Sequence, residues 1–110
     1  MLLASIGSFP AVGSDLDWQE EVDYLLIFIE QSDCSFTRNN KEYDSAQARD
    51  HIAKKYDYVK KRINSTEQFI AYAASKSSIT GRPYQVTCGT TTMPSSTWLE
   101  EALQSYRSAR

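Results

Sequence analysis

The chain has 110 residues and a formal net charge of −2 at pH 7, with 41% apolar and 24% charged residues. This length fits a single domain with one core, and an aromatic content of 12% excludes a disordered chain. The weak negative charge offers no electrostatic attraction to nucleic acid, so we expect no nucleic-acid partner.

Residues 1–14 read MLLASIGSFPAVGS and contain no charged side chain. Residues 11–13 and 12–14 both match the small-x-small pattern of a signal-peptide cleavage site. No Lys or Arg forms the basic start of a signal peptide, so the segment is either a signal-peptide remnant or a disordered apolar leader. We favour the remnant and therefore expect export. No other segment approaches the ~18 apolar residues of a membrane-spanning helix, so we expect no transmembrane segment.

The first predicted element is a helix over residues 15–33. Asp15 can cap its start, and the acidic residues of its first turns suit the positive end of the helix dipole. The run 24–29 is apolar on all sides, as a buried strand would be, but its length and the lack of a preceding turn favour a well-buried helix. The residues at helical spacing are Trp18, Val22, Leu25, Leu26 and Ile29.

A hairpin is predicted over residues 34–43, which read CSFTRNNKEY. Polar and apolar residues alternate up to Arg38, and the pair Asn39 and Asn40 tolerates the positive φ angles of a tight turn. Lys41–Tyr43 would return as a short second strand.

Two more helices are predicted after the hairpin. Residues 45–63 form the clearest one, with Asp44 or Ser45 as its cap. Residues 64–68 then hold a capping box in either of two registers, and a helix follows over 66–77. The apolar face of the first of these helices consists of Ala48, Ile52, Tyr56, Val59 and Ile63.

The chain leaves the third helix through Gly81, which suits a helix stop, and Pro83, which prevents a return to helix. Residues 84–88 (YQVTC) alternate as a strand, and residues 89–94 are predicted to be a threonine-rich loop.

A last helix, capped by Ser95 or Ser96, ends the chain. The predicted fold is therefore α+β: about four helices packed on a small two- or three-stranded antiparallel sheet, as a single domain over residues 15–110. Residues 15–33 are acidic and residues 45–64 are basic, so we expect these two helices to pack side by side.

The two cysteines, Cys34 and Cys88, lie far apart in the chain, and there is one histidine. These residues form neither a CxxC redox pair nor an ordinary zinc site, so we predict no metal and no cofactor. A disulfide or two free buried thiols remain. We favour the disulfide, because it would join the start of the hairpin to the end of the strand that needs the hairpin as its pairing partner. Closing so long a loop stabilises a fold by about 4 kcal/mol in the chain-entropy model.

Three segments carry a family resemblance: FTRNN at residues 36–40, STEQFI at 65–70 and ASKSSITGRPY at 74–84. They resemble the YfeK-like family of small bacterial periplasmic proteins, which carry a domain of unknown function. The family pattern has a glycine where Asn40 stands, and asparagine can adopt the same left-handed turn. The resemblance implies a periplasmic location and supplies no activity.

The hairpin, the second helix, the end of the third helix and the loop over residues 77–84 supply the candidate binding residues. Several hydroxyls, the backbone N–H groups near Gly81 and one arginine in that loop would suit a carboxylate or a phosphate. Each feature also has a structural interpretation, because the loop can be a helix end followed by a proline turn, and hairpin side chains can bond inward. The candidates are Arg38, Asn39, Tyr43, His51, Ser75, Ser78, Thr80, Arg82 and Tyr84.

His51 lies at the flank of the apolar face of the second helix. A single histidine at such a boundary is usually a hydrogen-bonded structural residue, and the alternative is a general base that acts on a serine of the nearby loop. No GxSxG or SxxK motif surrounds those serines. We interpret the basic stretch of the second predicted helix as a solvated face: Lys54, Lys55, Lys60, Lys61 and Arg62.

Three functional hypotheses follow. The first is a monomeric, non-enzymatic binding or interaction domain of the cell envelope, with an unknown envelope component or protein as its partner. The second is a small inhibitor of an envelope or foreign hydrolase, which would insert residues 90–95 as a protruding loop. The third is a hydrolase that uses His51. The first hypothesis predicts one cleft lined by Arg38, Tyr43, His51, Ser78 and Tyr84.

Overall fold

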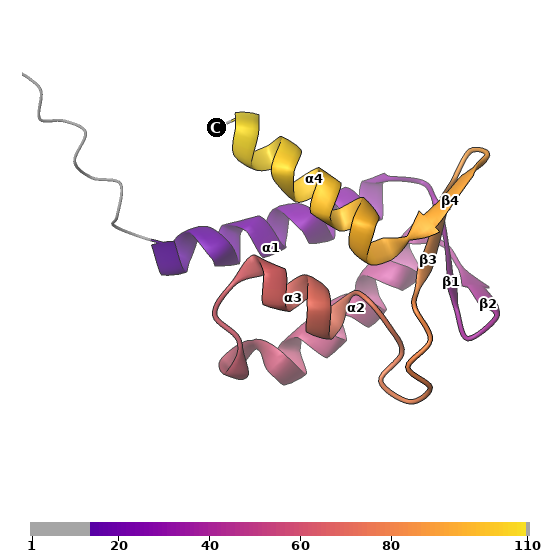
Figure 1. The fold of residues 1–110 in the computed structure, drawn as a ribbon, viewed down its shortest axis with the longest axis horizontal. Coiled ribbons are helices and arrows are strands. Elements are labelled where there is room, and N and C mark those ends of the chain that lie inside the picture. Colours follow the sequence, from indigo (N-terminus) through magenta and orange to yellow (C-terminus); the bar gives the residue numbers. More distant parts are fainter. Residues whose placement is uncertain (1–13, 110) are drawn as a thin grey trace, which may run out of the picture.

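The computed structural model describes residues 14–109 (Figure 1). The predicted leader therefore lies outside the described residues, apart from Ser14, where the first helix begins. The elements in chain order are α1 (Ser14–Gln31), β1 (Ser35–Arg38), β2 (Lys41–Tyr43), α2 (Ser45–Val59), a 3₁₀ helix (Lys60–Arg62), α3 (Thr66–Ala73), β3 (Gln85–Cys88), β4 (Thr91–Pro94) and α4 (Ser95–Ala109). The α+β class is as predicted.

The strands form one antiparallel sheet in the order β2-β1-β3-β4. In Figure 1 they gather at one end of the molecule, and the helices extend away from them. The pairing of β1 with β3 is the one that the sequence predicted, with Phe36 opposite Val86. The sheet has four strands, however, so the predicted number of two or three was wrong.

The additional strand β4 covers most of residues 89–94, which were predicted to be a loop. Gly89 has a φ of +64° and is the first residue of a two-residue turn, the arrangement typical of a type II′ hairpin turn. Thr91 then pairs with Cys88, and Pro94 ends the strand at the edge of the sheet, where a missing N–H is tolerated. The protruding loop of the inhibitor hypothesis is therefore mainly a strand.

The hairpin of β1 and β2 turns at Asn39 and Asn40, whose φ values are +53° and +67°. Positive φ at both central residues is what a type I′ turn requires, and asparagine tolerates it. This part of the sequence prediction is confirmed.

The starts of α2 and α3 follow the predicted capping chemistry, whereas α1 begins at Ser14 and therefore includes Asp15, its predicted cap. The Asp44 side chain accepts from the N–H of Gln47, whose own side chain accepts from the N–H of Asp44. The Ser65 side chain likewise accepts from the N–H of Gln68 at the start of α3. Ser95 differs from the expectation, because it is the first residue of α4 and its hydroxyl donates to the carbonyl of Ala74.

Helix α3 ends at Ala73, four residues earlier than predicted. The chain beyond it pairs instead with the approach to β3, since the N–H of Tyr84 donates to the carbonyl of Ser75, and that of Ser77 to the carbonyl of Arg82. The Ser75 hydroxyl also donates to the carbonyl of Ile70 at the helix end. Backbone pairing between the two sides of the loop thus replaces the last predicted turn of the helix.

The core is formed by side chains of all four α-helices, together with Phe36 of β1 and Val86 of β3. Helix α2 packs along α1, as the opposite charges predicted, and Arg49 Nε lies 3.8 Å from Glu30 Oε1. Among the described residues, no helix is long and apolar enough to cross a membrane. The largest apolar side chains without exposed surface are Val22, Leu25, Ile29, Ile70, Phe69, Val86, Leu99 and Leu103.

One buried carboxylate joins three helices. Glu21 of α1 is 2% exposed, and Arg107 of α4 donates to both of its oxygens at 2.9 Å. The hydroxyl of Thr66 donates to the same carboxylate at 2.6 Å, and Arg107 also donates to Glu67 of α3 at 2.8 Å. A bidentate arginine with a further hydrogen bond is the arrangement that compensates a charge for its burial.

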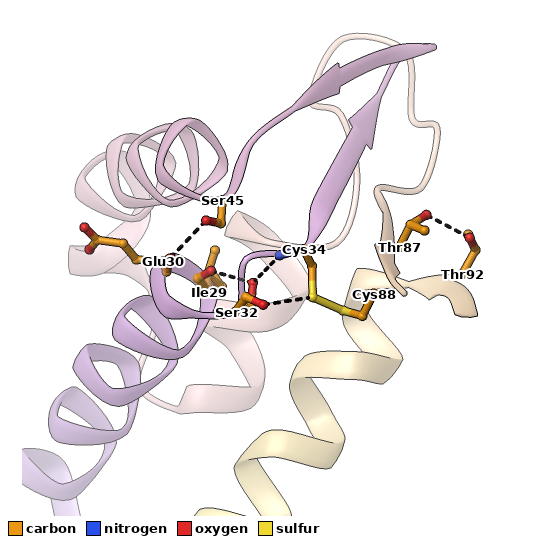
Figure 2. The surroundings of a disulfide bond; sticks show 8 residues. All are labelled: Ile29, Glu30, Ser32, Cys34, Ser45, Thr87, Cys88 and Thr92. Atoms are coloured by element: carbon orange, nitrogen blue, oxygen red, sulfur yellow. Dashed lines mark hydrogen bonds between the residues drawn. A yellow bond between two sulfur atoms is a disulfide. The ribbon is translucent and has the colours of Figure 1, made fainter. Parts of the chain in front are cut away.

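Cys34 and Cys88 form a disulfide, which confirms the predicted pairing (Figure 2). The bond joins the residue before β1 to the last residue of β3. The approach to Cys34 is held by Ser32, whose hydroxyl donates to the carbonyl of Ile29 and accepts from the N–H of Cys34. The disulfide therefore fixes the end of α1 against the central strands.

Candidate functional site

Two adjoining hollows share the side chains of Arg38, His51 and Tyr84 as a common wall. The first, which we call the apolar hollow, has a volume of about 330 Å³ and lies between the hairpin and the first half of α2. The second, the tyrosine hollow, has a volume of about 420 Å³ and lies between the end of α2, α3 and the loop before β3. We call the two hollows together the groove.

The apolar hollow takes its name from the buried side chains of its floor, Phe36, Ala48 and Ile52. Its other lining residues are Thr37, Tyr43, Gln47, Asp50, Lys54 and Ser95. The tyrosine hollow is lined, beyond the shared wall, by Lys55, Tyr58, Val59, Arg62, Tyr72, Ser77, Ser78 and Ile79.

The Tyr84 hydroxyl is the centre of the shared wall. Tyr84 directly precedes β3 and is 4% exposed, and its oxygen lies 2.9 Å from Lys55 Nζ and 3.2 Å from His51 Nε2. An ammonium group can only donate, so Lys55 donates to the Tyr84 oxygen. The tyrosine proton is then available to the unprotonated Nε2 of a neutral His51.

Helix α2 and strand β1 position the basic side chains around the Tyr84 hydroxyl. His51 and Lys55 are one turn apart on α2 and therefore project from the same face. Lys55 also donates to the carbonyl of Lys76 at 2.8 Å, which holds the end of α3 against α2. Arg38 is the last residue of β1, donates to the Tyr43 hydroxyl at 3.0 Å, and places its guanidinium carbon 5.1 Å from the centre of that ring.

The wall is electropositive. Burial lowers the pKa of His51 below its usual value, and the charges of Arg38, Lys55 and Lys54 lower it further. Burial also lowers the pKa of Lys55, with Arg38 adding to the effect. The pKa of Tyr84 is raised by burial, against the opposing effect of Arg38.

Carboxylates do not neutralise this wall. None of the ion pairs within residues 18–109 involves Arg38, His51 or Lys55. Asp50 is the one acidic residue that lines either hollow, and it pairs with Arg49 at 3.1 Å. The arrangement can therefore donate hydrogen bonds and positive charge to an anionic group in the groove.

The predicted cleft residues are divided between the two hollows. Tyr43 lines the apolar hollow, Ser78 lines the tyrosine hollow, and Arg38, His51 and Tyr84 line both.

The other four candidate binding residues line neither hollow. Asn39 bonds inward, donating to the Ser77 hydroxyl and accepting from the Thr80 hydroxyl, so that it ties the hairpin tip to the loop. Ser75 bonds to the end of α3, and Arg82 is exposed.

The side chain of His51 forms its hydrogen bond with a tyrosine, Tyr84, rather than with a serine. The Ser75 hydroxyl donates to the carbonyl of Ile70, and the Ser77 hydroxyl accepts from Asn39 and from the N–H groups of Ile79 and Thr80. The Ser–His pair that a hydrolase would need is therefore not formed by these hydrogen bonds.

Sequence reasoning missed Lys55 as a site residue, because it was assigned to a solvated basic face. Its spacing of four residues from His51 is the signal that could have found it. The tyrosine hollow also holds three of the four large apolar side chains that are most exposed in the described chain. These are Tyr58 at 76%, Tyr72 at 60% and Ile79 at 87%.

Comparison with known proteins identifies relatives without an assigned activity. A family model described as "Family of unknown function (DUF5329)" matches residues 17–107. The chain is 40% identical over 60 residues to the "Uncharacterized protein YfeK" of Salmonella typhimurium, a match that covers 54% of this chain and 50% of that protein. The chain thus spans about half the length of this curated relative. No solved structure matches the chain.

Proposed function

We propose that this chain, which belongs to the DUF5329 family of unknown function, is a non-enzymatic binding domain of the bacterial cell envelope. Its ligand carries an anionic group, a carboxylate or a phosphate, which binds at Arg38, His51 and Lys55. We call these three residues the basic cluster. The observation that carries the proposal is the position of this cluster around the buried Tyr84 hydroxyl, without a carboxylate in an ion pair with it.

The electrostatic cost of the cluster supports this ligand. Three basic side chains that face one another weaken the native state unless an opposite charge joins them. Burial is the largest cause of the lowered pKa values of His51 and Lys55, and the neighbouring positive charges lower them further. A bound anion would offset the repulsion between these charges, and the guanidinium and ammonium donors would form charge-assisted hydrogen bonds with the anion.

The disulfide and the leader support the location. Disulfides persist in oxidising compartments such as the periplasm and are rare in the cytosol. The chain has one disulfide, and residues 1–14 have the small-residue pattern of a cleavage site. Both observations support a periplasmic location as part of the proposal.

A titration with sodium phosphate and with sodium acetate, followed by backbone amide NMR, tests the proposal. We expect the amide signals of the groove to shift until the anion saturates the site. The Lys55→Gln variant should bind each anion at least fivefold more weakly than the parent chain does. Lys61→Gln is the matched control, because Lys61 is an exposed lysine outside both hollows. The recovered ligand should be chemically unchanged. Shifts spread over the surface, weakened equally by the two substitutions, would overturn the proposal.

A further inference from the structure

We infer that the ligand is an extended peptide segment of a partner protein, in which an acidic residue lies between two apolar ones at positions i, i+2 and i+4. This inference rests on the proposed function and specifies the ligand of the same site. Three observations carry it: the length of the groove, the order of its surfaces, and the exposed apolar side chains at one end.

The groove is long and runs beside α2. Gln47 lines the apolar hollow and Arg62 lines the tyrosine hollow. Helix α2 and the 3₁₀ helix after it rise at least 1.5 Å per residue, so this stretch covers about 22 Å. An extended peptide rises about 3.3 Å per residue, so about seven residues would fill the groove. A single phosphate or carboxylate would occupy only its centre.

The surfaces follow one another in a fixed order. The buried floor of Phe36 and Ile52 lies in the apolar hollow, the basic cluster lies at or beside the shared wall, and Tyr72 and Ile79 lie in the tyrosine hollow. In an extended chain, residues i, i+2 and i+4 project to the same face. An apolar, acidic, apolar order on that face matches the order of the groove.

Exposed apolar side chains favour a peptide over other anions. Ile79 is 87% exposed, and Tyr58 and Tyr72 lie in the same hollow. Clustered exposed apolar residues mark surfaces that bind partners, and tyrosine is enriched at protein interfaces. An acidic glycan or a phosphate polymer would use the basic cluster but would leave Ile79 and the floor of the apolar hollow without a partner.

Panning a display library of random heptapeptides against the oxidised, full-length protein tests the inference. We expect enriched sequences with Asp or Glu between two apolar residues in the stated spacing. Synthetic copies, acetylated at the start and amidated at the end, should lose at least tenfold in affinity when the acidic residue is changed to its amide. The same loss should follow when either apolar residue is changed to serine.

Protein variants locate the binding. Ile79→Ser and Tyr72→Ala change exposed side chains and should leave the fold intact. The loss of affinity for the peptide in each variant should be at least fivefold larger than its loss of affinity for inorganic phosphate. Ile27→Ser is the matched control, because Ile27 is 52% exposed and lies outside the groove. This control should bind the peptide like the parent chain.

The outcomes separate the inference from the proposed function. Enrichment of no sequence, or of sequences without an acidic residue, overturns the inference. If phosphate still shifts the groove amides in that case, the proposed function stands. Trigalacturonate and phosphatidylglycerol vesicles serve as further probes, and binding of either one at the groove in place of peptides would identify a glycan or a lipid ligand and overturn the inference. If no anion shifts the groove amides, both proposals fail.

Discussion

The Tyr84 hydroxyl lies 3.2 Å from Nε2 of His51 and 2.9 Å from Nζ of Lys55, so one buried residue contacts both basic groups of α2. Because Lys55 donates to the same oxygen, the tyrosine proton points to the histidine, and a neutral imidazole is its natural acceptor. The wall thus favours the neutral form of His51 by burial, by neighbouring charges and by this hydrogen bond.

The pKa of His51 should therefore lie below 6.5, the value of an unperturbed histidine. Titration of the imidazole proton signals by NMR measures it. Lys55→Gln should raise this pKa toward 6.5 without reaching it, because burial, the largest cause, and the charge of Arg38 remain. A pKa at or above 6.5 in the parent chain would contradict the description of the wall.

The lowered pKa of His51 should make the free energy of unfolding depend on pH. A histidine whose pKa is lower in the folded state takes up its proton more readily when unfolded, so its contribution to stability is complete above pH 6.5 and is lost as the pH falls through the folded pKa. We expect the free energy of unfolding of the parent chain, relative to His51→Gln, to fall between pH 7.5 and pH 5. Urea unfolding at both pH values measures this. A difference that does not change with pH would contradict the prediction.

Binding of an anion should have the opposite pH dependence. An anion beside His51 stabilises the protonated imidazole, so acetate, which stays ionised over this range, should bind more tightly at pH 5.5 than at pH 7.5. The groups that surround the imidazole are Arg38, Lys54, Lys55, Asp50 and Tyr84. His51→Gln should remove most of this pH dependence, and isothermal titration at the two pH values compares the variants. An unchanged pH dependence in His51→Gln would assign the effect to another group.

Removing Arg107 should destabilise the fold strongly. Arg107→Ala takes both guanidinium bonds from the buried carboxylate of Glu21, a change that costs about 3 kcal/mol. Glu67→Ala removes an exposed partner of the same arginine and should cost less than about 1 kcal/mol. Urea unfolding of both variants measures the difference. Equal losses would mean that the Glu21 pair adds nothing specific.

The disulfide should form in the cell. Protein isolated from an expressing bacterium under acid quench should show no thiol that reacts with an alkylating reagent before reduction. The variant with Cys34→Ser and Cys88→Ser should lose about 2–5 kcal/mol of stability, because the unfolded chain is no longer constrained. Two free thiols in the isolated protein would contradict both the bond and the proposed periplasmic location.

The turn of the first hairpin offers a matched pair of substitutions. Asn40 is exposed and has a φ of +67°, so Asn40→Ala should cost about 1 kcal/mol, because alanine is strained in the left-handed region. Asn40→Gly should keep or raise the stability. Melting curves of the two variants compare them, and equal stability would show that the φ angle carries no cost.

The parts of the fold that the sequence predicted are those with a strong local signal. The helical period of α1 and α2, the caps at Asp44 and Ser65 and the asparagine pair of the hairpin each act within a few residues. Strand β4 has no such signal, because it is an edge strand with both faces largely exposed. Of its four residues, Met93 alone is partly buried, so no alternation of apolar and polar residues marks it.

The site was predicted less completely than the fold, for a related reason. Arg38, His51 and Tyr84 lie in or next to a hairpin, a helix and a strand that the sequence predicted. Lys55 is a site residue because the segment before β3 lies beside α2, where the Tyr84 hydroxyl accepts a hydrogen bond from Lys55. Tyr72 and Ile79 meet at one hollow because α3 ends early and the chain turns back. Such contacts between distant segments depend on tertiary packing, which a local sequence pattern does not encode.

The disulfide has a topological consequence for the groove. Every residue that lines the two hollows, except Ser95, lies between Cys34 and Cys88. The walls of the groove therefore belong to one covalent macrocycle, with α1 before the ring and β4 and α4 after it in the chain. A protease that cuts a single peptide bond in the exposed loop over residues 78–83 opens the ring, but the two fragments stay joined through sulfur. A nicked chain would migrate as one species without reductant and as two with it, and the walls of the groove would remain linked.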